Sequence, residues 1–203
     1  MTGTPSTSTR SSTAFHRPPP PSSRYAEHLY SKRDYAAAVD EYIETIGVLP
    51  PSSVISKYLV AQRVPELTRY LYALHATPSA PLAAAEHTTL LLRCLTKLDD
   101  AASIDEYVGW ACAQPRGSAS VHVGAAVEVL RSSGYATLAI RLSHARSETL
   151  LMLELLLEET HDYDRALATI RGMETSQARL AMLRWGRELL LHRAEQVCNL
   201  LIQ

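Results

Sequence analysis

The sequence has almost no net charge and no long apolar run. Its 203 residues carry 20 basic and 21 acidic side chains, a net charge of -1. Such a chain has no overall field that would attract nucleic acid or an anionic membrane. Its most apolar stretch, residues 150–157, is far shorter than the ~20 residues that a membrane-spanning helix needs. We therefore expect no nucleic-acid partner, and only peripheral, indirect contact with membranes.

Cysteine and glycine are also scarce. The three cysteines, Cys94, Cys112 and Cys198, lie far apart and form no CxxC pair. This argues against a disulfide framework and indicates a reducing compartment such as the cytoplasm, with the thiols packed as small hydrophobic groups.

The eight glycines occur singly, and none belongs to a GxGxxG, GxxxxGK[ST] or GxSxG motif. No phosphate-binding loop or nucleophile turn is predicted.

The acidic residues and histidines form no recognisable catalytic or metal-binding pattern. Adjacent acids are frequent, but neighbouring residues on a helix point in different directions, which makes such pairs poor acid/base catalysts. No histidine belongs to an HExxH motif or to an HxxxH pair with a nearby acid. The eight histidines are His16, His28, His75, His87, His122, His144, His161 and His192. We expect a non-enzymatic protein with no catalytic, cofactor-binding or metal-binding residues.

Residues 1–23 differ in composition from the remainder. They contain eleven Ser or Thr and five Pro, and their only large apolar side chains are Met1 and Phe15. Such a segment buries too little surface to offset the entropy of ordering, so we predict a disordered tail. Arg10 and Arg17 among serines also fit a mitochondrial transit peptide, but the proline run at 18–21 opposes the amphipathic helix that this requires. The prolines also fit an aromatic groove of a partner or a simple spacer.

From residue 24 onward the apolar spacing is helical. Between residues 35 and 46 apolar groups recur at i, i+3, i+4, i+7, i+8 and i+11, and strand-like alternation is hard to find. A second stripe consists of Ala178, Ala181, Met182, Trp185, Leu189 and Leu190. Gly47 and Pro50-Pro51 end the first helix, Ser52 or Ser53 is the expected cap of the next, and Pro78–Pro81 and Pro115–Gly117 mark loops. The chain is predicted to be all-α.

The breaks between helices are roughly periodic. A tight turn followed by a helix rich in small residues recurs along the chain, with markers at Tyr35, Val64, Asp100, Tyr135 and Tyr163. The intervals between them are 29, 36, 35 and 28 residues, about the length of a clathrin-heavy-chain or tetratricopeptide repeat. Residues 24–203 are therefore predicted to form an α-solenoid of stacked antiparallel helix pairs, in which each pair buries its apolar stripe on its neighbours.

Several segments resemble the vacuolar protein sorting-associated protein 11 family. Residues 25–30, leading into Asp34-Tyr35 and Ala38, look like a clathrin-heavy-chain-type repeat. The segments that resemble the family in particular follow: 42–47, 51–55, 61–63, 67–71 with Leu74-His75, and 87–92 with 96–98. The resemblance is close from about residue 24 to 108, whereas later segments such as 127–130, Gly134-Tyr135 and Asp162-Tyr163 keep the spacing more than the letters.

The resemblance implies a scaffold subunit shared by the HOPS and CORVET tethering complexes. Its implied place is cytoplasmic, peripheral on the late endosome and the vacuole or lysosome. Its implied partners are the other tethering subunits and, indirectly, Rab GTPases and SNARE proteins. Family members also carry a β-propeller and a RING zinc domain, which this sequence does not match. We expect a fragment of a longer solenoid, and the uncapped apolar end at residues 197–203 agrees with packing on a further repeat.

One basic segment is a candidate docking site. Arg179, Arg184, Arg187 and Arg193 are predicted to form a positive strip beside Trp185. The alternative is an exposed face that keeps the solenoid soluble. A different function, a tetratricopeptide-like adaptor that binds peptides, would require a concave groove with clustered Lys, Arg and Asn side chains.

Overall fold

The computed structural model describes residues 21–76, 84–114 and 121–202. These residues form eleven α-helices and no β-strand, which confirms the all-α prediction. The helices are α1 (Pro21–Ser31), α2 (Tyr35–Ile43), α3 (Pro51–Val60), α4 (Val64–Ala76), α5 (Ala85–Leu98), α6 (Ala101–Ala113), α7 (Val123–Ser132), α8 (Ala136–Ala145), α9 (Thr149–Glu158), α10 (Tyr163–Arg171) and α11 (Thr175–Ile202).

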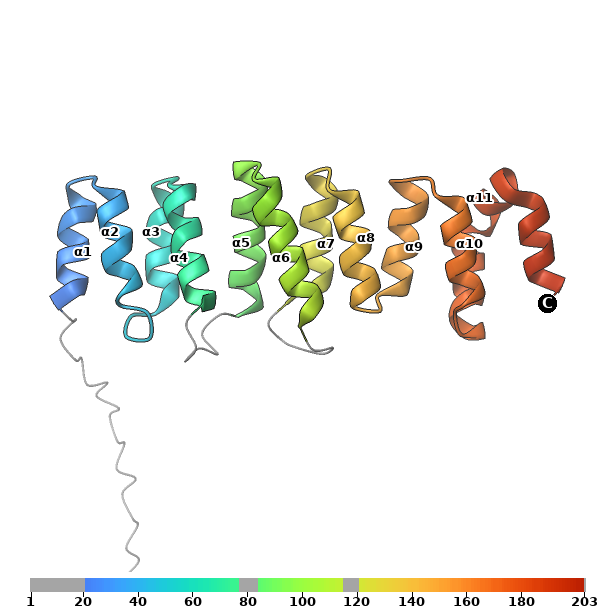
Figure 1. The fold of residues 1–203 in the computed structure, drawn as a ribbon, viewed down its shortest axis with the longest axis horizontal. Coiled ribbons are helices and arrows are strands. Elements are labelled where there is room, and N and C mark those ends of the chain that lie inside the picture. The colour runs from blue at the N-terminus through green and yellow to red at the C-terminus, as the bar shows by residue number, and fades with distance from the viewer. Residues whose placement is uncertain (1–20, 77–83, 115–120, 203) are drawn as a thin grey trace, which may run out of the picture.

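The helices stand side by side in one row, in chain order (Figure 1). Each helix packs on its neighbours in sequence or on the next but one, as in the pairs α2·α4, α5·α7, α6·α8 and α9·α11. This serial packing is the predicted α-solenoid, in which stability comes from contacts between adjacent hairpins.

A short turn of fixed conformation joins the two helices of each hairpin. Residues with left-handed backbone occupy five of these turns: Arg33, Gln62, Asp99, Gly134 and His161, with φ between 51° and 82°. In three hairpins the next residue is an aspartate, Asp34, Asp100 or Asp162, whose carboxylate accepts a hydrogen bond from the backbone N–H three residues later. The reversal ends one helix and the aspartate caps the next.

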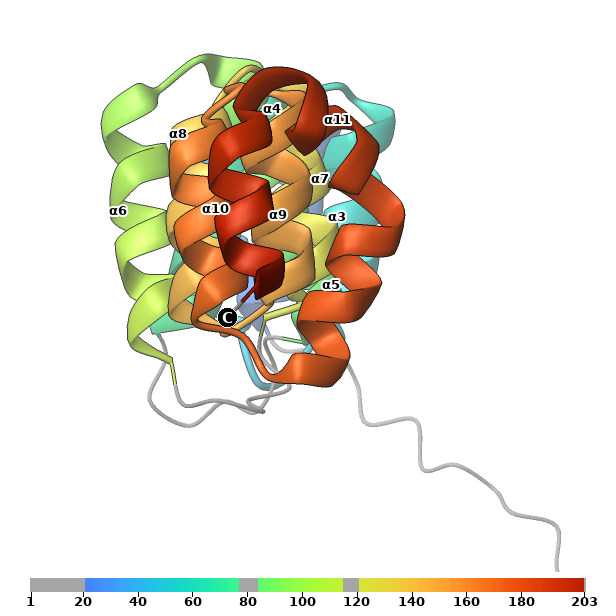
Figure 2. The ribbon, with the colours of Figure 1, turned by 90° about the vertical axis from the view of Figure 1, so that its right-hand side faces the viewer.

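The long helix α11 is itself a hairpin. The backbone of Arg193 (φ -145°, ψ 48°) is not helical and divides α11 into two segments, and the second segment folds back toward α10 (Figure 2). Arg193 therefore lies at a sixth turn, although no glycine or proline marks it.

The structure changes several details of the sequence-based interpretation. Helix α2 ends at Ile43 rather than Ile46, and the residue before α3 is Pro50, with Pro51 in the first turn, so neither Ser52 nor Ser53 is the cap. Leu190, assigned to the buried stripe, is exposed. Helix α1 begins at Pro21, three residues before the expected boundary. The tail residues 1–20 and the predicted loops at 78–81 and 115–117 lie outside the described residues.

Small residues and tyrosines fill the seams between helices. Ala38, Ala139 and Ala166 occupy the same position of their repeats, four residues after the N-cap residue, and all are fully buried. They allow the second helix of a hairpin to approach its neighbours closely. The rings of Tyr30 and Tyr42 each pack edge-on against Tyr58, with centroids 5.6 and 6.1 Å away. This agrees with a packing role for the tyrosines rather than a ligand groove.

Two buried tyrosines provide a matched test of this packing. The Tyr58 hydroxyl donates a hydrogen bond to the Tyr35 carbonyl at 3.0 Å, whereas the buried Tyr107 hydroxyl has no partner among the described residues. We expect Tyr58→Phe to lower the free energy of unfolding by about 1 kcal/mol and Tyr107→Phe to leave it unchanged or raise it. Urea unfolding followed by circular dichroism measures both, and equal losses would contradict the assigned contacts.

Ion pairs link neighbouring hairpins, and the two partners of each pair lie about one repeat apart in the sequence. Lys57 pairs with Glu27, and Arg69 with Asp40, across the first two hairpins. Further along, the pairs are Arg141–Asp105, Arg131 with Glu154, Glu158 and Glu159, Arg184–Glu154, and Arg193–Asp164, at 2.6–3.2 Å. These pairs help to fix how one hairpin sits on the next.

Candidate interaction surface

The structure separates the four arginines of the predicted strip into two kinds. Arg184 donates to the Glu154 carboxylate at 2.9 Å, and its guanidinium lies 4.5 Å from the ring centre of the buried Trp185. Arg193 makes two hydrogen bonds to Asp164. These two arginines therefore act within the stack, and only Arg179 and Arg187 remain as candidates for docking.

Arg179 and Arg187 flank an apolar groove on the first segment of α11. The groove has a volume of about 580 Å³ and is lined by Arg179, Met182, Leu183, Gly186, Arg187, Leu190 and Leu191. Leu183 is 78% exposed and Leu191 is 75% exposed. We call this surface the α11 leucine face.

The opposite side of the same helical segment is buried in the stack. Ala181 and Leu189 are fully buried and Trp185 nearly so. A helix that is apolar on both sides is typical of an interior position in a larger assembly. Within the predicted apolar end at residues 197–203, Val197 is fully buried, and the side chains of residues 201–203 lie outside the described part of the chain; the exposed leucines named above lie earlier in α11.

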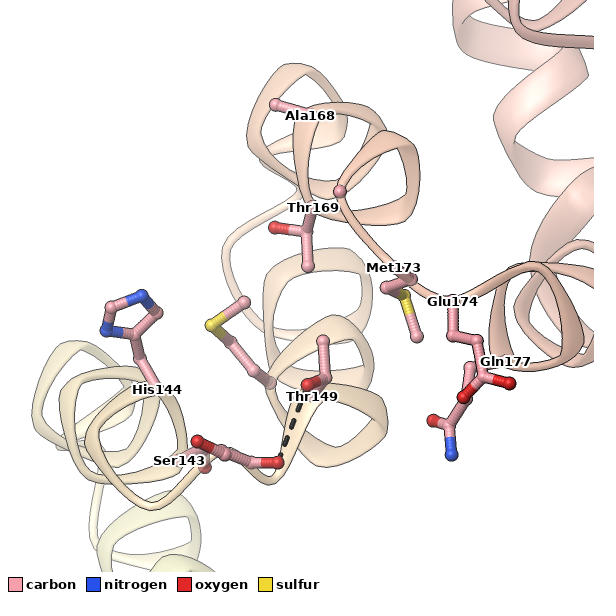
Figure 3. Close-up of a pocket in the computed structure, with 11 residues that line it drawn as sticks. Ser143, His144, Thr149, Ala168, Thr169, Met173, Glu174 and Gln177 are labelled. Atoms are coloured by element: carbon pink, nitrogen blue, oxygen red, sulfur yellow. Dashed lines mark hydrogen bonds between the residues drawn. The ribbon is translucent and has the colours of Figure 1, made fainter.

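A pocket of about 620 Å³ lies between the ends of α8 and α10 and the starts of α9 and α11 (Figure 3). Its lining residues are Ser143, His144, Ser147, Thr149, Met152, Ala168, Thr169, Gly172, Met173, Glu174 and Gln177. The hydroxyls of Ser143 and Thr169 donate to backbone carbonyls of their own helices. The lining contains no Lys, Arg or Asn, so this pocket lacks the cluster expected of a tetratricopeptide-like peptide groove.

The pKa shifts arise from burial and from hydrogen bonds and charges within the stack. Burial raises the pKa of Tyr70 to about 12 and also raises the pKa of the Cys94 and Cys112 thiols. Hydrogen bonds from Arg193 lower the pKa of Asp164, which faces solvent.

Among residues 21–76, 84–114 and 121–202, no group of three or more His, Cys, Asp or Glu side chains is placed to hold a metal ion. In the same ranges, no helix has the length and apolarity to cross a bilayer.

The sequence of almost the whole row of hairpins matches a known family. Residues 30–203 match the family model described as the PEP5/VPS11 clathrin repeat. The chain belongs to this family. Membership agrees with the turns and serial packing seen here.

Several members of the PEP5/VPS11 family are similar along most of the chain. The mouse vacuolar protein sorting-associated protein 11 homolog is 42% identical over 182 residues, which cover 88% of this chain and 18% of the relative. The Arabidopsis thaliana homolog is 36% identical over 180 residues, 89% of this chain and 19% of the relative. The Dictyostelium discoideum homolog is 36% identical over 179 residues, 88% and 18%. The chain thus spans about a fifth of the length of these relatives.

Proposed function

We propose that this chain is a non-catalytic scaffold segment of a HOPS- or CORVET-like tethering complex that acts in vacuolar protein sorting. The observation that carries the proposal is the match to the PEP5/VPS11 clathrin repeat over residues 30–203, together with relatives named for vacuolar protein sorting. The proposed place of action is the cytoplasmic side of the late endosome and vacuole, where the complex meets Rab GTPases and SNARE proteins.

The mechanism is positional rather than chemical. Adjacent hairpins share buried side chains and are joined by ion pairs such as Glu27–Lys57 and Glu154–Arg184. These contacts resist bending between repeats, so the row acts as a semi-rigid spacer. Partners bind its helix surfaces, and the binding requires no turnover.

The α11 leucine face is the proposed joint to a further helical hairpin of a longer solenoid. The exposed leucines lie on the side of α11 opposite its buried residues, whereas α9 packs on α11 within the stack. The charges alternate along the row as well: Arg131 on α7 meets Glu154 on α9, which meets Arg184 on α11. We therefore expect the next helix to place carboxylates opposite Arg179 and Arg187.

Co-purification with individual HOPS and CORVET subunits tests the scaffold role. The tagged chain is expected to retain at least one of these subunits. Leu183→Glu combined with Leu191→Glu reduces recovery if the leucine face takes part in assembly. Val60→Glu is the matched control, because Val60 is 85% exposed on α3, away from that face. Recovery of no subunit by the wild-type chain would contradict the scaffold proposal.

A further inference from the structure

Two exposed aromatic side chains lie at the junction between the second and third hairpins. Trp110 on α6 and Tyr72 on α4 are each 37% exposed. His75, one helical turn beyond Tyr72, contacts the Trp110 ring edge-on, with ring centroids 6.0 Å apart and planes at 89°. We call Tyr72, His75 and Trp110 the aromatic surface.

The second and third hairpins meet through α4 and α5. Helix α2 packs on α4 and α6 on α8, whereas α4 makes no comparable contact with α6, and the same pattern recurs where α8 packs on α9 and not on α10. Helix α6 lies farther out than α8 and α10, the second helices of the next two hairpins (Figure 2). Within the described residues no ion pair spans this junction, which is joined by His75 Nε2 and Thr88 Oγ1 at 3.0 Å.

Hydrogen bonds fix the His75 ring within the aromatic surface. Besides the contact with Thr88, His75 Nδ1 lies 2.6 Å from the Leu71 carbonyl, so both ring nitrogens are held. The ring of the buried Tyr107 packs against the Trp110 ring, with centroids 5.9 Å apart. A preorganised aromatic surface loses little side-chain entropy when a ligand binds.

Glu106 places a negative charge beside Trp110 of the aromatic surface. Glu106 lies one turn before Trp110 on the same side of α6 and is exposed. Helix α6 carries Asp105 and Glu106 but no basic residue, and Asp105 is already paired with Arg141. Glu106 has no ionic partner in the described part of the chain. A ligand for this surface therefore combines an apolar, flat-stacking part with a cation.

We propose that the aromatic surface docks a proline-rich segment with a flanking arginine, namely residues 17–20 of a second copy of this chain. That segment reads Arg17-Pro18-Pro19-Pro20. Proline rings pack on exposed aromatic faces, and an extended proline run loses little conformational entropy on binding. Arg17 supplies the cation for Glu106 through a charge-assisted hydrogen bond.

The donor is a second copy because of where the segment is attached. Pro20 is joined directly to α1, and α2 to α5 separate α1 from α6 in the row (Figure 1). The residues between Arg17 and α1 are too few to span those helices, since an extended residue covers at most about 3.6 Å. The contact would hold two solenoid segments together independently of the α11 leucine face.

Tryptophan fluorescence tests the proposal. In the Trp185→Phe variant Trp110 is the only tryptophan, because the sequence contains two. A synthetic peptide of residues 8–20 is titrated into this variant at a protein concentration where sedimentation shows a monomer. We expect a saturable change in Trp110 emission, with binding at least tenfold weaker for Glu106→Lys or Tyr72→Ala and unchanged for the control Glu128→Lys.

Two altered peptides decide the chemistry of the occupant. A peptide with alanine at positions 18–20, and one with Arg17→Ala, should each bind at least tenfold more weakly. The proposal is overturned by the absence of saturable change up to millimolar peptide, or by equal binding of the alanine peptides. Circular dichroism verifies that each protein variant is folded. None of these outcomes bears on recovery of tethering subunits, so this proposal and the scaffold proposal fail separately.

Discussion

Leu153→Ala is expected to lower the free energy of unfolding by about 2–5 kcal/mol, the range for a leucine deleted from a packed core. Leu153 is fully buried on α9, and Met152, Leu155, Leu156 and Leu157 of the same helix are buried as well. Since α9 packs on α8, α10 and α11, the surrounding side chains have little freedom to fill the cavity. Urea unfolding followed by circular dichroism measures the loss.

Leu183→Ala is the control for this substitution. Leu183 is 78% exposed, so its truncation should change stability by less than about 0.5 kcal/mol. The serial packing adds a spatial expectation: hydrogen exchange in Leu153→Ala should rise in α8 to α11 and remain unchanged in α1 and α2. A uniform rise in all helices would indicate one cooperative core instead of a stack.

Arg131→Ala is expected to cost about 1–3 kcal/mol, between the values for surface and buried ion pairs. The Arg131 guanidinium, 29% exposed, bonds to Glu154, Glu158 and Glu159 on α9 at 3.2, 2.9 and 2.6 Å. Its removal leaves three carboxylates close together, and among the described residues only Arg184 pairs with one of them, Glu154. Thermal unfolding at 0.1 M salt measures the effect.

A single exposed ion pair is the comparison for Arg131. Arg141 pairs with Asp105, and both side chains are about half exposed, so Arg141→Ala should cost at most about 1 kcal/mol. In 1 M salt, where charges are screened within about 3 Å, mutual repulsion among the three glutamates falls and the Arg131→Ala loss should shrink. Equal losses for the two variants at low salt would contradict a special role for Arg131.

The hairpins could be predicted because their signals are local. The Asp34-Tyr35 and Asp162-Tyr163 turns combine a helix cap with a following apolar stripe, and both are read from a few adjacent residues. The break at Arg193 was missed because it uses neither glycine nor proline. It has one long-range signal, the spacing of 29 residues to its ion-pair partner Asp164, close to one repeat.

The interaction surfaces were less predictable because they depend on contacts between repeats. Arg184 and Arg193 looked like part of an exposed strip, but carboxylates one repeat earlier bind both. Leu190 fits the buried stripe by its spacing, yet it is exposed because no described element covers that side of α11. Trp110 carried no signal at all, since its exposure results from the position of α6 relative to α4.

Small-angle X-ray scattering of the monomeric protein tests the serial stack most directly. A compact domain of 203 residues would have a radius of gyration of about 17 Å and a symmetrical distance distribution. The row of hairpins predicts a larger radius and a distribution that peaks near the width of one helix pair and falls slowly toward long distances. A radius near 17 Å with a symmetrical distribution would contradict the solenoid.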